Sequence, residues 1–518
     1  MRGARTESRS LFRYSPALLL VAIVVADAGR FADPDLWGHV RFGQGVLNTW
    51  HLTRHDPYSY SAARHVWNDH EWLSELVLAF SYGALGVAGL KLMKFCCTAA
   101  TIVLLALNEA ETAASPTLQF SVLIVSAVAL GPELQFRPQL FTFIFLSATL
   151  WMLTRDNYGR RAHLWLIVPI MVLWVNLHGG FFIGLVTLAV YATVATIGDL
   201  YGGGGWNHGV RLVALTICAA VATLATPYGF TNWYAVMHTL HNPITRNLVL
   251  EWQPLLRVMR LDAHSGHSGL ALYLIVLGVM AAFAITVALT PRRHDLPLVA
   301  IAVVMTAAAF VSVRNMALAI IAINGPLTDH AALVAERMRT SRAATDVRSR
   351  RRISWLTNQV VLTAIAVALM AHTGLFSKRL PEGIAYPAGA VAFMKDHDLH
   401  GNLLADFNWG EYLIFHMAPE SKVFIDSRYD LVYPQKIIQD YATFYSGFPA
   451  ANVVIDSYPH EFVLIPPDCA VYPVMTARTD WKLVYRDQNA AVFARAGSPA
   501  TSLPHIPVLG SAPQSYFP

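Results

Sequence analysis

Apolar runs close to the length of a membrane-spanning helix recur along most of this chain. Its 518 residues are 55% hydrophobic and only 14% charged, whereas soluble domains carry about 25% charged residues. A transmembrane helix needs about 20 predominantly apolar residues, and the mean hydropathy of +0.43 exceeds that of soluble globules of this size. The runs lack the alternation of barrel strands, so helices must satisfy the backbone in lipid. The sequence therefore predicts a mainly α, polytopic membrane protein and excludes a cytosolic enzyme, a coiled coil and a disordered chain.

Basic residues cluster in short loops beside the apolar runs, which is the distribution of the positive-inside rule. The net charge of +5 therefore indicates membrane topology and not a nucleic-acid partner. The basic flank Arg2–Arg13 places the N-terminus in the cytoplasm, and the arginine-rich loop 324–354 forms a second cytoplasmic anchor. About 11 crossings then place the C-terminal region on the outer face.

The individual crossings follow from the apolar runs. Runs whose flanking charges agree on a topology lie at 15–29, 73–90, 164–177, 181–197, 210–225, 270–289, 296–313, 316–323 and 355–373, and three short runs of ambiguous topology lie at 95–107, 118–130 and 140–153. Because Lys91 and Lys94 before the short runs and Arg155 after them would all be cytoplasmic, an even number of the short runs must cross. We therefore expect one of the three to be re-entrant or buried.

The domain boundaries follow the change in composition near residue 377. We expect a transmembrane domain over 1–376, with a first outer loop at 30–72 and a second large outer loop at 227–266. Strand-like runs at 402–407, 422–425, 461–465 and 481–494 alternate with helix-like stretches at 389–398 and 434–446. This alternation predicts a small extracytoplasmic α/β domain over 377–496. The Pro-, Ser- and Gly-rich tail 497–518 is predicted to be disordered.

Two carboxylates follow directly after the first predicted span. Asp33 and Asp35 flank Pro34, which stiffens the turn between them. A carboxylate at the membrane face can act as a general base toward an acceptor hydroxyl, or it can ligate a divalent cation. The alternative is structural, with Asp33 capping a helix. Further polar candidates for a substrate cavity in the same loop are His39, Arg41, Asp69, His70 and Glu71.

The predicted topology brings other polar residues to the same outer face. They are Arg137, Asn176, His178, Tyr228, Glu251, Trp252 and Arg314, with Arg137 included if its loop faces outward. Arg314 at a lipid boundary suits a phosphate or pyrophosphate, because its planar fork binds such oxygens in pairs. A salt bridge of Arg314 to Glu251 is the structural alternative. For His178 the alternative is a satisfied core histidine.

Asp426 and Arg428 directly follow a predicted strand of the C-terminal domain. Sites on open sheets lie at such strand ends, so both residues are candidates for a lid or for acceptor binding. The alternative is a local ion pair that fixes the turn.

These strings together resemble the GT-C superfamily, which comprises integral-membrane glycosyltransferases that use polyprenyl-phosphate-linked sugars. Within it they look like a set of bacterial membrane proteins. The residues that carry the resemblance are Asp33-Pro-Asp-Leu-Trp37, Asp56-Pro-Tyr-Ser-Tyr60, Asp69-His-Glu-Trp72, Trp174-Val-Asn-Leu-His178 and Phe424-Ile-Asp-Ser-Arg428. The resemblance covers nearly the whole chain.

The resemblance implies a role for the outer-face residues. A first-loop carboxylate is the catalytic base or a metal ligand in this superfamily, which assigns that role to Asp33 or Asp35, with Asp33 nearer the membrane. The cation would be Mg²⁺ or Mn²⁺. Many members have adjacent acidic residues there, whereas Pro34 separates them here. Basic residues commonly hold the lipid phosphate, which assigns that role to Arg314 and Arg137.

The sequence thus predicts an inverting glycosyltransferase, of hexosyl or pentosyl type, in the bacterial inner membrane. It would transfer a sugar from a polyprenyl-phosphate donor to a hydroxyl of a lipid, glycan or protein acceptor at the outer face. Two alternatives stay open at this point. One is a transporter or flippase for lipid-linked glycans, which would be expected to carry inverted repeats. The other is a non-catalytic relative that binds glycan or lipid.

Overall fold

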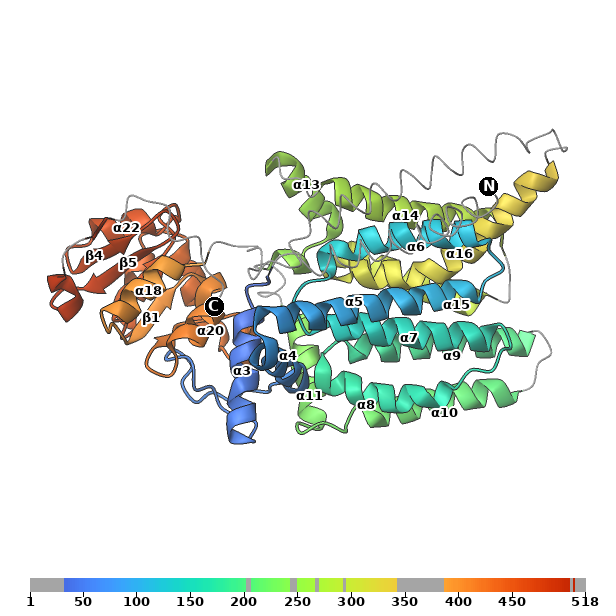
Figure 1. The fold of residues 1–518 in the computed structure, drawn as a ribbon, viewed down its shortest axis with the longest axis horizontal. Coiled ribbons are helices and arrows are strands. Elements are labelled where there is room, and N and C mark those ends of the chain that lie inside the picture. Colours follow the sequence, from blue (N-terminus) through green and yellow to red (C-terminus); the bar gives the residue numbers. More distant parts are fainter. Residues whose placement is uncertain are drawn as a thin grey trace, which may run out of the picture. The chain divides into compact units, whose positions relative to one another are not determined.

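The computed structural model describes residues 32–201, 206–242, 249–265, 270–291, 295–341, 386–503 and 506–507. By their contacts these residues form two units, drawn in Figure 1. The bundle unit comprises the described residues of 91–229 and 249–341, and the sheet unit comprises those of 32–90, 230–242 and 386–507. The predicted spans 15–29 and 355–373 lie outside the described residues.

The bundle unit consists of helices that run along one common direction (Figure 1). They are α5 Val87–Ala110, α6 Pro116–Leu130, α7 Gln139–Asn157, α8 Ile167–Leu177, α9 Phe181–Tyr201, α10 Trp206–Ala222, α14 Leu270–Leu289, α15 Leu296–Val311 and α16 Met316–Ser341, with the shorter α13 Leu255–Ser265 beside α14 and α15. Among the described residues, five helices are long and apolar enough to cross a membrane. The prediction of a multi-pass helical membrane protein is confirmed, and the total of about 11 crossings stays a prediction.

The predicted span 73–90 is wrong, because the chain changes direction inside it. Helix α4, Trp72–Leu85, ends at Gly86, whose φ of 59° and ψ of −141° lie outside the helical region. With 14 residues α4 is about 21 Å long, too short for a hydrocarbon core of about 30 Å. It packs instead on α3, Leu36–Thr49, within the sheet unit.

The crossing helix is therefore α5, and Lys91 and Lys94 lie within it and not in a cytoplasmic loop. The three short apolar runs are α5, α6 and α7, which have 24, 15 and 19 residues. Of these three helices, α5 and α6 with the turn that continues it to Glu133 are long and apolar enough to cross a membrane. The parity argument for a re-entrant run loses its basis, because it started from the wrong span 73–90, and the number of crossings between α5 and Arg155 stays a prediction.

The C-terminal part of the sheet unit is a six-stranded sheet with the strand order β2-β1-β3-β5-β4-β6. The strands are β1 Asn402–Ala405, β2 Lys422–Val423, β3 Phe462–Ile465, β4 Trp481–Arg486, β5 Ala491–Arg495 and β6 Ile506–Pro507. The helices are α18 Ala388–Asp396, α19 Gly410–Met417, α20 Gln435–Tyr445, α21 Ala451–Ser457 and α22 Tyr472–Ala477. The central strand β3 is buried over its whole length, as its continuous apolar sequence requires. The predicted α/β domain is confirmed.

Two details of this domain differ from the prediction. The run 481–494 forms two antiparallel strands, because the Asp487 carboxylate accepts hydrogen bonds from the backbone N–H groups of Asn489 and Ala490 and closes a turn. The beginning of the predicted disordered tail is ordered, since Ile506–Pro507 pairs with β4 and Ala500 is fully buried. Residues 508–518 lie outside the described residues.

The first outer loop belongs to the same unit as this sheet. Ser59 forms a parallel bridge with Val423, so the loop extends the β2 edge of the sheet. The backbone bonds are Val423 N–H to the Tyr58 carbonyl at 3.1 Å and Tyr60 N–H to the Val423 carbonyl at 3.2 Å. Helix α11, Phe230–His241, joins the unit through His238, whose Nδ1 lies 3.0 Å from the Asp430 carboxylate. Segments separated by more than 300 positions therefore fold as one body.

The crossing of α3 and α4 depends on Gly43, and this generates a prediction. A Cβ at residue 43 would overlap the Glu75 carbonyl, whereas a Cβ at Gly45 would meet only the Tyr58 hydroxyl at 3.6 Å. We expect Gly43→Ala to destabilise the protein by about 1–3 kcal/mol through overpacking. Gly45→Ala is the matched control, and its higher helix propensity, worth about 1 kcal/mol, should leave stability unchanged or raised. Apparent melting temperatures in detergent measure both, and equal shifts for the two variants would contradict the packing argument.

Candidate functional site

The two predicted catalytic carboxylates lie at the start of α3 in different environments. Asp33 is 2% exposed, and its Oδ1 accepts a hydrogen bond from the Asp35 N–H at 3.0 Å. The Asp33 carbonyl accepts another from the Tyr386 hydroxyl at 3.2 Å. Asp35 is the N-cap residue of α3 and is half-buried, and its side chain makes no capping bond. Asp33 therefore shapes the turn before the helix, while the Asp35 carboxylate is the more accessible of the two.

Glu411 of α19 lies against this end of α3 and was missed from the sequence. Its carboxylate occupies the space where a Cβ of Gly38 would be, and its Oε1 accepts a hydrogen bond from the Ser427 hydroxyl. Burial raises the pKa of Glu411 well above its usual value, and the negative charges of Asp35 and Asp426 raise it further. Glu411 is therefore a carboxyl group close to Asp35 whose protonated form is favoured by its surroundings. Its position in the first turn of the short apolar helix α19 is the signal that sequence inspection could have used.

The remaining first-loop candidates gather around His39. His39 Nδ1 lies 3.2 Å from Glu75 Oε1, and its Nε2 lies 4.0 Å from Glu71 Oε2. His70 Nε2 lies 3.6 Å from Glu71 Oε1. The structure therefore brings His39, His70 and Glu71 together, and it adds Glu75, which follows Glu71 by one helical turn.

A buried carboxyl pair lies in the same group. Asp69 is 5% exposed, and burial together with the neighbouring Glu75 raises its pKa well above the usual range. Burial also raises the pKa of Glu75 to about 8, and its hydrogen bond with Asp69 moderates that shift. The pair consequently retains a proton at neutral pH, because two like charges so close together cannot both be ionised cheaply.

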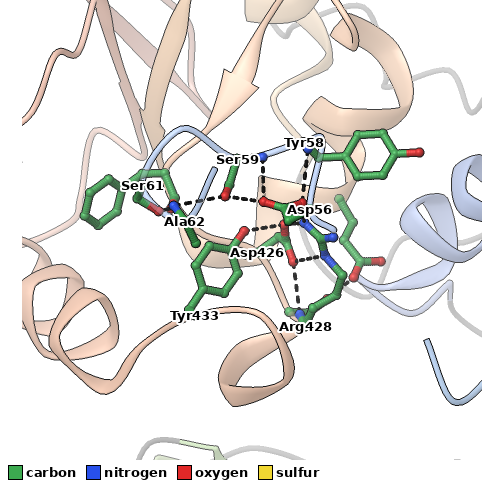
Figure 2. A network of polar contacts seen from close by, with 11 residues as sticks. Asp56, Tyr58, Ser59, Ser61, Ala62, Asp426, Arg428 and Tyr433 are labelled. Atoms are coloured by element: carbon green, nitrogen blue, oxygen red, sulfur yellow. Dashed lines mark hydrogen bonds and ion pairs between the residues drawn. The ribbon is translucent and has the colours of Figure 1, made fainter. Parts of the chain in front are cut away.

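Arg41 and Arg428 connect α3 and the first loop to the C-terminal domain. Arg41 Nη2 donates to the Ala418 carbonyl at 3.0 Å, at the end of α19. Arg428 binds Asp426 through Nε at 2.8 Å and Nη2 at 2.6 Å, and Nη2 also lies 2.9 Å from Asp56 Oδ1 (Figure 2). Arg428 is 7% exposed and Asp426 is fully buried. Both residues therefore hold protein segments together, as the ion-pair alternative proposed, and neither faces an open cavity.

The bundle unit brings four of the predicted outer-face residues together. Arg137 Nη1 donates to Glu251 Oε1 at 2.6 Å and to Oε2 at 2.7 Å. The guanidinium carbon of Arg314 lies 5.2 Å from the centroid of the Trp252 ring. Burial alone would raise the pKa of Glu251, but the charges of Arg137 and Arg314 outweigh it and hold the pKa below the usual value. Arg137 and Arg314 therefore both lie near the Glu251 carboxylate, and Arg137 is the one that forms the ion pair with it.

Arg314 differs from Arg137 in how its nitrogens are used. Within the described part of the chain, its guanidinium makes no hydrogen bond and no ion pair, and it is half-buried over Trp252. The segment that carries it is held in place by Ser312, whose hydroxyl donates to the Glu251 carbonyl at 2.9 Å, and by Val313, whose N–H donates to the Gln253 carbonyl at 3.0 Å. A positioned guanidinium with donors to spare can bind an anion of phosphate geometry.

Lys94 is a basic residue that was predicted to lie in a cytoplasmic loop and lies instead within helix α5. Its side chain is fully buried, and Nζ lies 4.5 Å over the ring of Phe136, the residue before Arg137. A lysine interpreted as a cytoplasmic anchor therefore lies near the cluster of Arg137 and Glu251. The positive-inside rule misassigned it because the rule assumes that lysines beside a span are solvated.

Two predicted cavity residues of the bundle unit form hydrogen bonds with protein groups, and a third is buried. Asn176 Nδ2 donates to the carbonyls of Val172 at 2.7 Å and Ala225 at 2.8 Å. His178 Nδ1 accepts from the Gly180 N–H at 2.9 Å and lies 2.7 Å from the Thr142 hydroxyl. His178 therefore matches the satisfied core histidine of the structural alternative. Tyr228 is buried, with 8% of its surface exposed.

A divalent cation at Asp33 and Asp35 is not supported by the described residues. Among them, no three His, Cys, Asp or Glu side chains are arranged to hold a metal ion. The Asp33 carboxylate already accepts a backbone hydrogen bond.

Comparison with known proteins gives matches in fold but not in sequence. No family model matches the chain, and no curated protein matches it in sequence. The archaeal oligosaccharyltransferase AglB from Archaeoglobus fulgidus, in complex with an inhibitory peptide and a dolichol-phosphate, matches with a TM-score of 0.57 and 11% identity. That match covers 95% of this chain and 75% of the other.

Two more solved structures match over most of this chain. The Archaeoglobus fulgidus oligosaccharyltransferase tethered with an acceptor peptide matches with a TM-score of 0.52 and 10% identity, covering 93% of this chain and 74% of the other. The arabinofuranosyltransferase AftD from Mycobacteria matches with a TM-score of 0.52 and 14% identity, covering 93% of this chain and 41% of the other. These proteins are GT-C glycosyltransferases, so the chain has the GT-C fold that the sequence predicted.

The raised pKa of Glu75 predicts how stability depends on pH. A carboxyl whose pKa rises from 4.5 in the unfolded chain to about 8 in the folded one stabilises the fold below pH 4.5, and this stability is lost as the pH rises through 8. The apparent melting temperature should therefore fall over this range in wild type and fall less in Glu75→Gln. Exposed Glu420→Gln is the control and should follow the wild type. Parallel profiles for all three proteins would contradict a buried proton at Glu75.

Proposed function

We propose that this protein is a glycosyltransferase of the bacterial inner membrane that transfers a sugar from a polyprenyl-phosphate donor to an acceptor hydroxyl at the outer face. The observation that carries the proposal is Arg314, a half-buried guanidinium held over Trp252 whose donors are unused among the described residues. A phosphate is the ligand whose oxygens match this planar fork. The GT-C fold and the dolichol-phosphate in the AglB structure support a lipid-linked donor.

Arg314 would bind the donor phosphate and stabilise the charge that develops on it. When the bond between the anomeric carbon and the phosphate oxygen breaks, the electron pair stays with that oxygen, and the lipid phosphate gains one negative charge. A fixed cation at this point stabilises the transition state more than the ground state. Arg137 would contribute less directly, because Glu251 already occupies part of its fork.

Asp35 would act as the general base in the same reaction. It would take the proton of the acceptor hydroxyl while the acceptor oxygen forms its bond to the anomeric carbon. A single displacement of this kind inverts the anomeric centre. Asp35 suits this role better than Asp33, because Asp33 is nearly fully buried and its carboxylate is committed to the turn.

Asp35 and Arg314 do not select one acceptor or one sugar. A hydroxyl of a lipid, glycan or protein would satisfy the chemistry of Asp35, and both hexosyl and pentosyl donors fit the proposal. A donor linked to a lipid agrees with an extracytoplasmic reaction, since the sugar then arrives through the membrane. In the proposed topology the N-terminus would lie in the cytoplasm and the C-terminal domain outside.

The first test concerns Arg314. Replacing Arg314 by Gln removes a charge-assisted contact worth about 1.5–3 kcal/mol, so we expect polyprenyl phosphate to bind about 10- to 100-fold more weakly. Exposed Arg257→Gln, on α13 in the loop 227–266, is the matched control and should bind like the wild type. Binding is measured by titrating labelled polyprenyl phosphate into the purified protein. Unchanged affinity of Arg314→Gln would remove the observation on which the proposal rests.

The second test concerns the base. With polyprenyl-phosphate sugars and candidate acceptors, release of polyprenyl phosphate should fall by about 10²- to 10⁴-fold in Asp35→Asn. Asp33→Asn should retain part of the activity, because an amide oxygen can still accept the Asp35 N–H bond. The reverse ranking would move the base to Asp33. Release that survives both changes would remove the first loop from catalysis, and lipid binding without any release in wild type would favour the transporter or the non-catalytic binding protein.

A further inference from the structure

We infer that Arg428 is a positioning residue for this reaction: the C-terminal domain uses it to hold α3, and with α3 the carboxylates at the start of that helix. The inference rests on the proposed function for its catalytic consequence. The geometry on which it rests, however, lies within the sheet unit and is independent of any substrate.

The guanidinium of Arg428 joins two segments that are far apart in the sequence. One edge of its fork binds both oxygens of Asp426, two residues away in the C-terminal domain. The same edge reaches Asp56 of the first outer loop, with Nη2 2.9 Å from Oδ1. Figure 2 shows the three side chains converging from these two segments. Because only a bidentate donor can satisfy Asp426 and reach Asp56 at once, the contact requires arginine.

The first loop encloses the other side of the same guanidinium with aromatic rings. The guanidinium carbon lies 4.7 Å from the Trp67 ring centroid, 5.0 Å from that of Phe42 and 5.4 Å from that of Tyr58. Nη1 is buried and has no hydrogen-bond partner among the described residues. Contact with the ring faces compensates for this, since a desolvated cation over aromatic rings is stabilised electrostatically. Phe42 belongs to α3 itself, so the cage includes the helix that carries Asp35.

Two buried carboxylates around one cation leave an excess negative charge, and neighbouring donors offset it. Asp56 accepts hydrogen bonds from the Tyr58 N–H at 3.1 Å, from the Ser59 N–H at 3.0 Å and from the Ser59 hydroxyl. Asp426 accepts from the Tyr433 hydroxyl at 2.6 Å, and burial and the Asp426 charge raise the pKa of Tyr433 far enough to keep it protonated. The carboxylates of Asp56 and Asp426 are thus both held by several donors, which favours a single geometry.

The start of α3 is held from the same domain at further points. Tyr386 donates to the Asp33 carbonyl, and Glu411 lies against Gly38. Phe42 is seven residues along a continuous helix from Asp35, a distance of about 10 Å. A shift of α3 at Phe42 therefore moves the Asp35 carboxylate by a comparable amount. Misplacement of a reacting group by about 1 Å can lower a rate by about 10²-fold.

The test uses the full-length protein and the variant Arg428→Lys. Lysine keeps the charge but cannot bind both Asp426 oxygens and Asp56 together, so we expect kcat to fall by about 100-fold while KM for the polyprenyl-phosphate donor changes less than twofold. Arg478→Lys is the matched control, because Arg478 also binds two carboxylates, those of Asp456 and Asp480, in the same domain. It should leave both constants at the wild-type values. A kcat of Arg428→Lys equal to that of Arg478→Lys would overturn the inference.

A second variant separates positioning from a general loss of folding. Asp56→Ala removes the contact from the loop side and leaves the Arg428–Asp426 pair intact, so the C-terminal domain should stay folded. Hydrogen exchange of the backbone amides of residues 36–49 should become faster in this variant, with the amides of β3 unchanged. This measurement needs no activity, so it tests the contact even if no donor is ever turned over. Unchanged exchange in α3 would overturn the inference whatever the outcome for the proposed function.

Discussion

The buried guanidinium of Arg428 is the interaction on which the sheet unit depends. A charge this deep in a protein is tolerated only when its partners are fixed, because the desolvation penalty exceeds the attraction of a loosely held pair. Asp56, Asp426 and three aromatic rings supply those partners from both segments. The first outer loop is therefore not an independent membrane-proximal loop. It completes a domain whose sheet begins more than 300 residues later.

Hydropathy could predict the helical class but not the direction of every helix. The apolar run across 73–90 is continuous in composition, and only the backbone of Gly86 separates α4 from α5. A window average cannot detect that turn, and Lys91 and Lys94 strengthened the wrong interpretation because they resemble a cytoplasmic anchor. In contrast, the strands of the C-terminal domain were recognisable, because they are short, largely apolar runs bounded by turn residues.

Sequence reasoning could group those residues of the candidate site whose side of the membrane is fixed by the predicted topology. Glu251 and Trp252 share one loop and Arg314 lies in another, and the requirement that these loops share one face was enough to group them, while Arg137 was included only if its loop faced outward. Glu75 and Glu411 were missed because each lies in the first turn of an apolar helix, and Lys94 was misassigned because a lysine beside a predicted span resembles a cytoplasmic anchor. Their significance comes from what packs against them, which depends on tertiary contacts that no local pattern contains.

Hydrogen-bond satisfaction separates the structural polar residues of this protein from the functional candidates. Asn176, His178, Arg41 and Arg428 were all plausible cavity residues by sequence, and each directs its polar atoms at protein partners. Arg314 is positioned as firmly by its neighbours, but its own donors are not used by the described residues. A folded chain gains little from fixing a cation and leaving its hydrogen bonds unmade, because each unmade bond forgoes stability. Such an arrangement is explained by a ligand that completes it, which is why Arg314 carries more weight than any other residue predicted from the sequence.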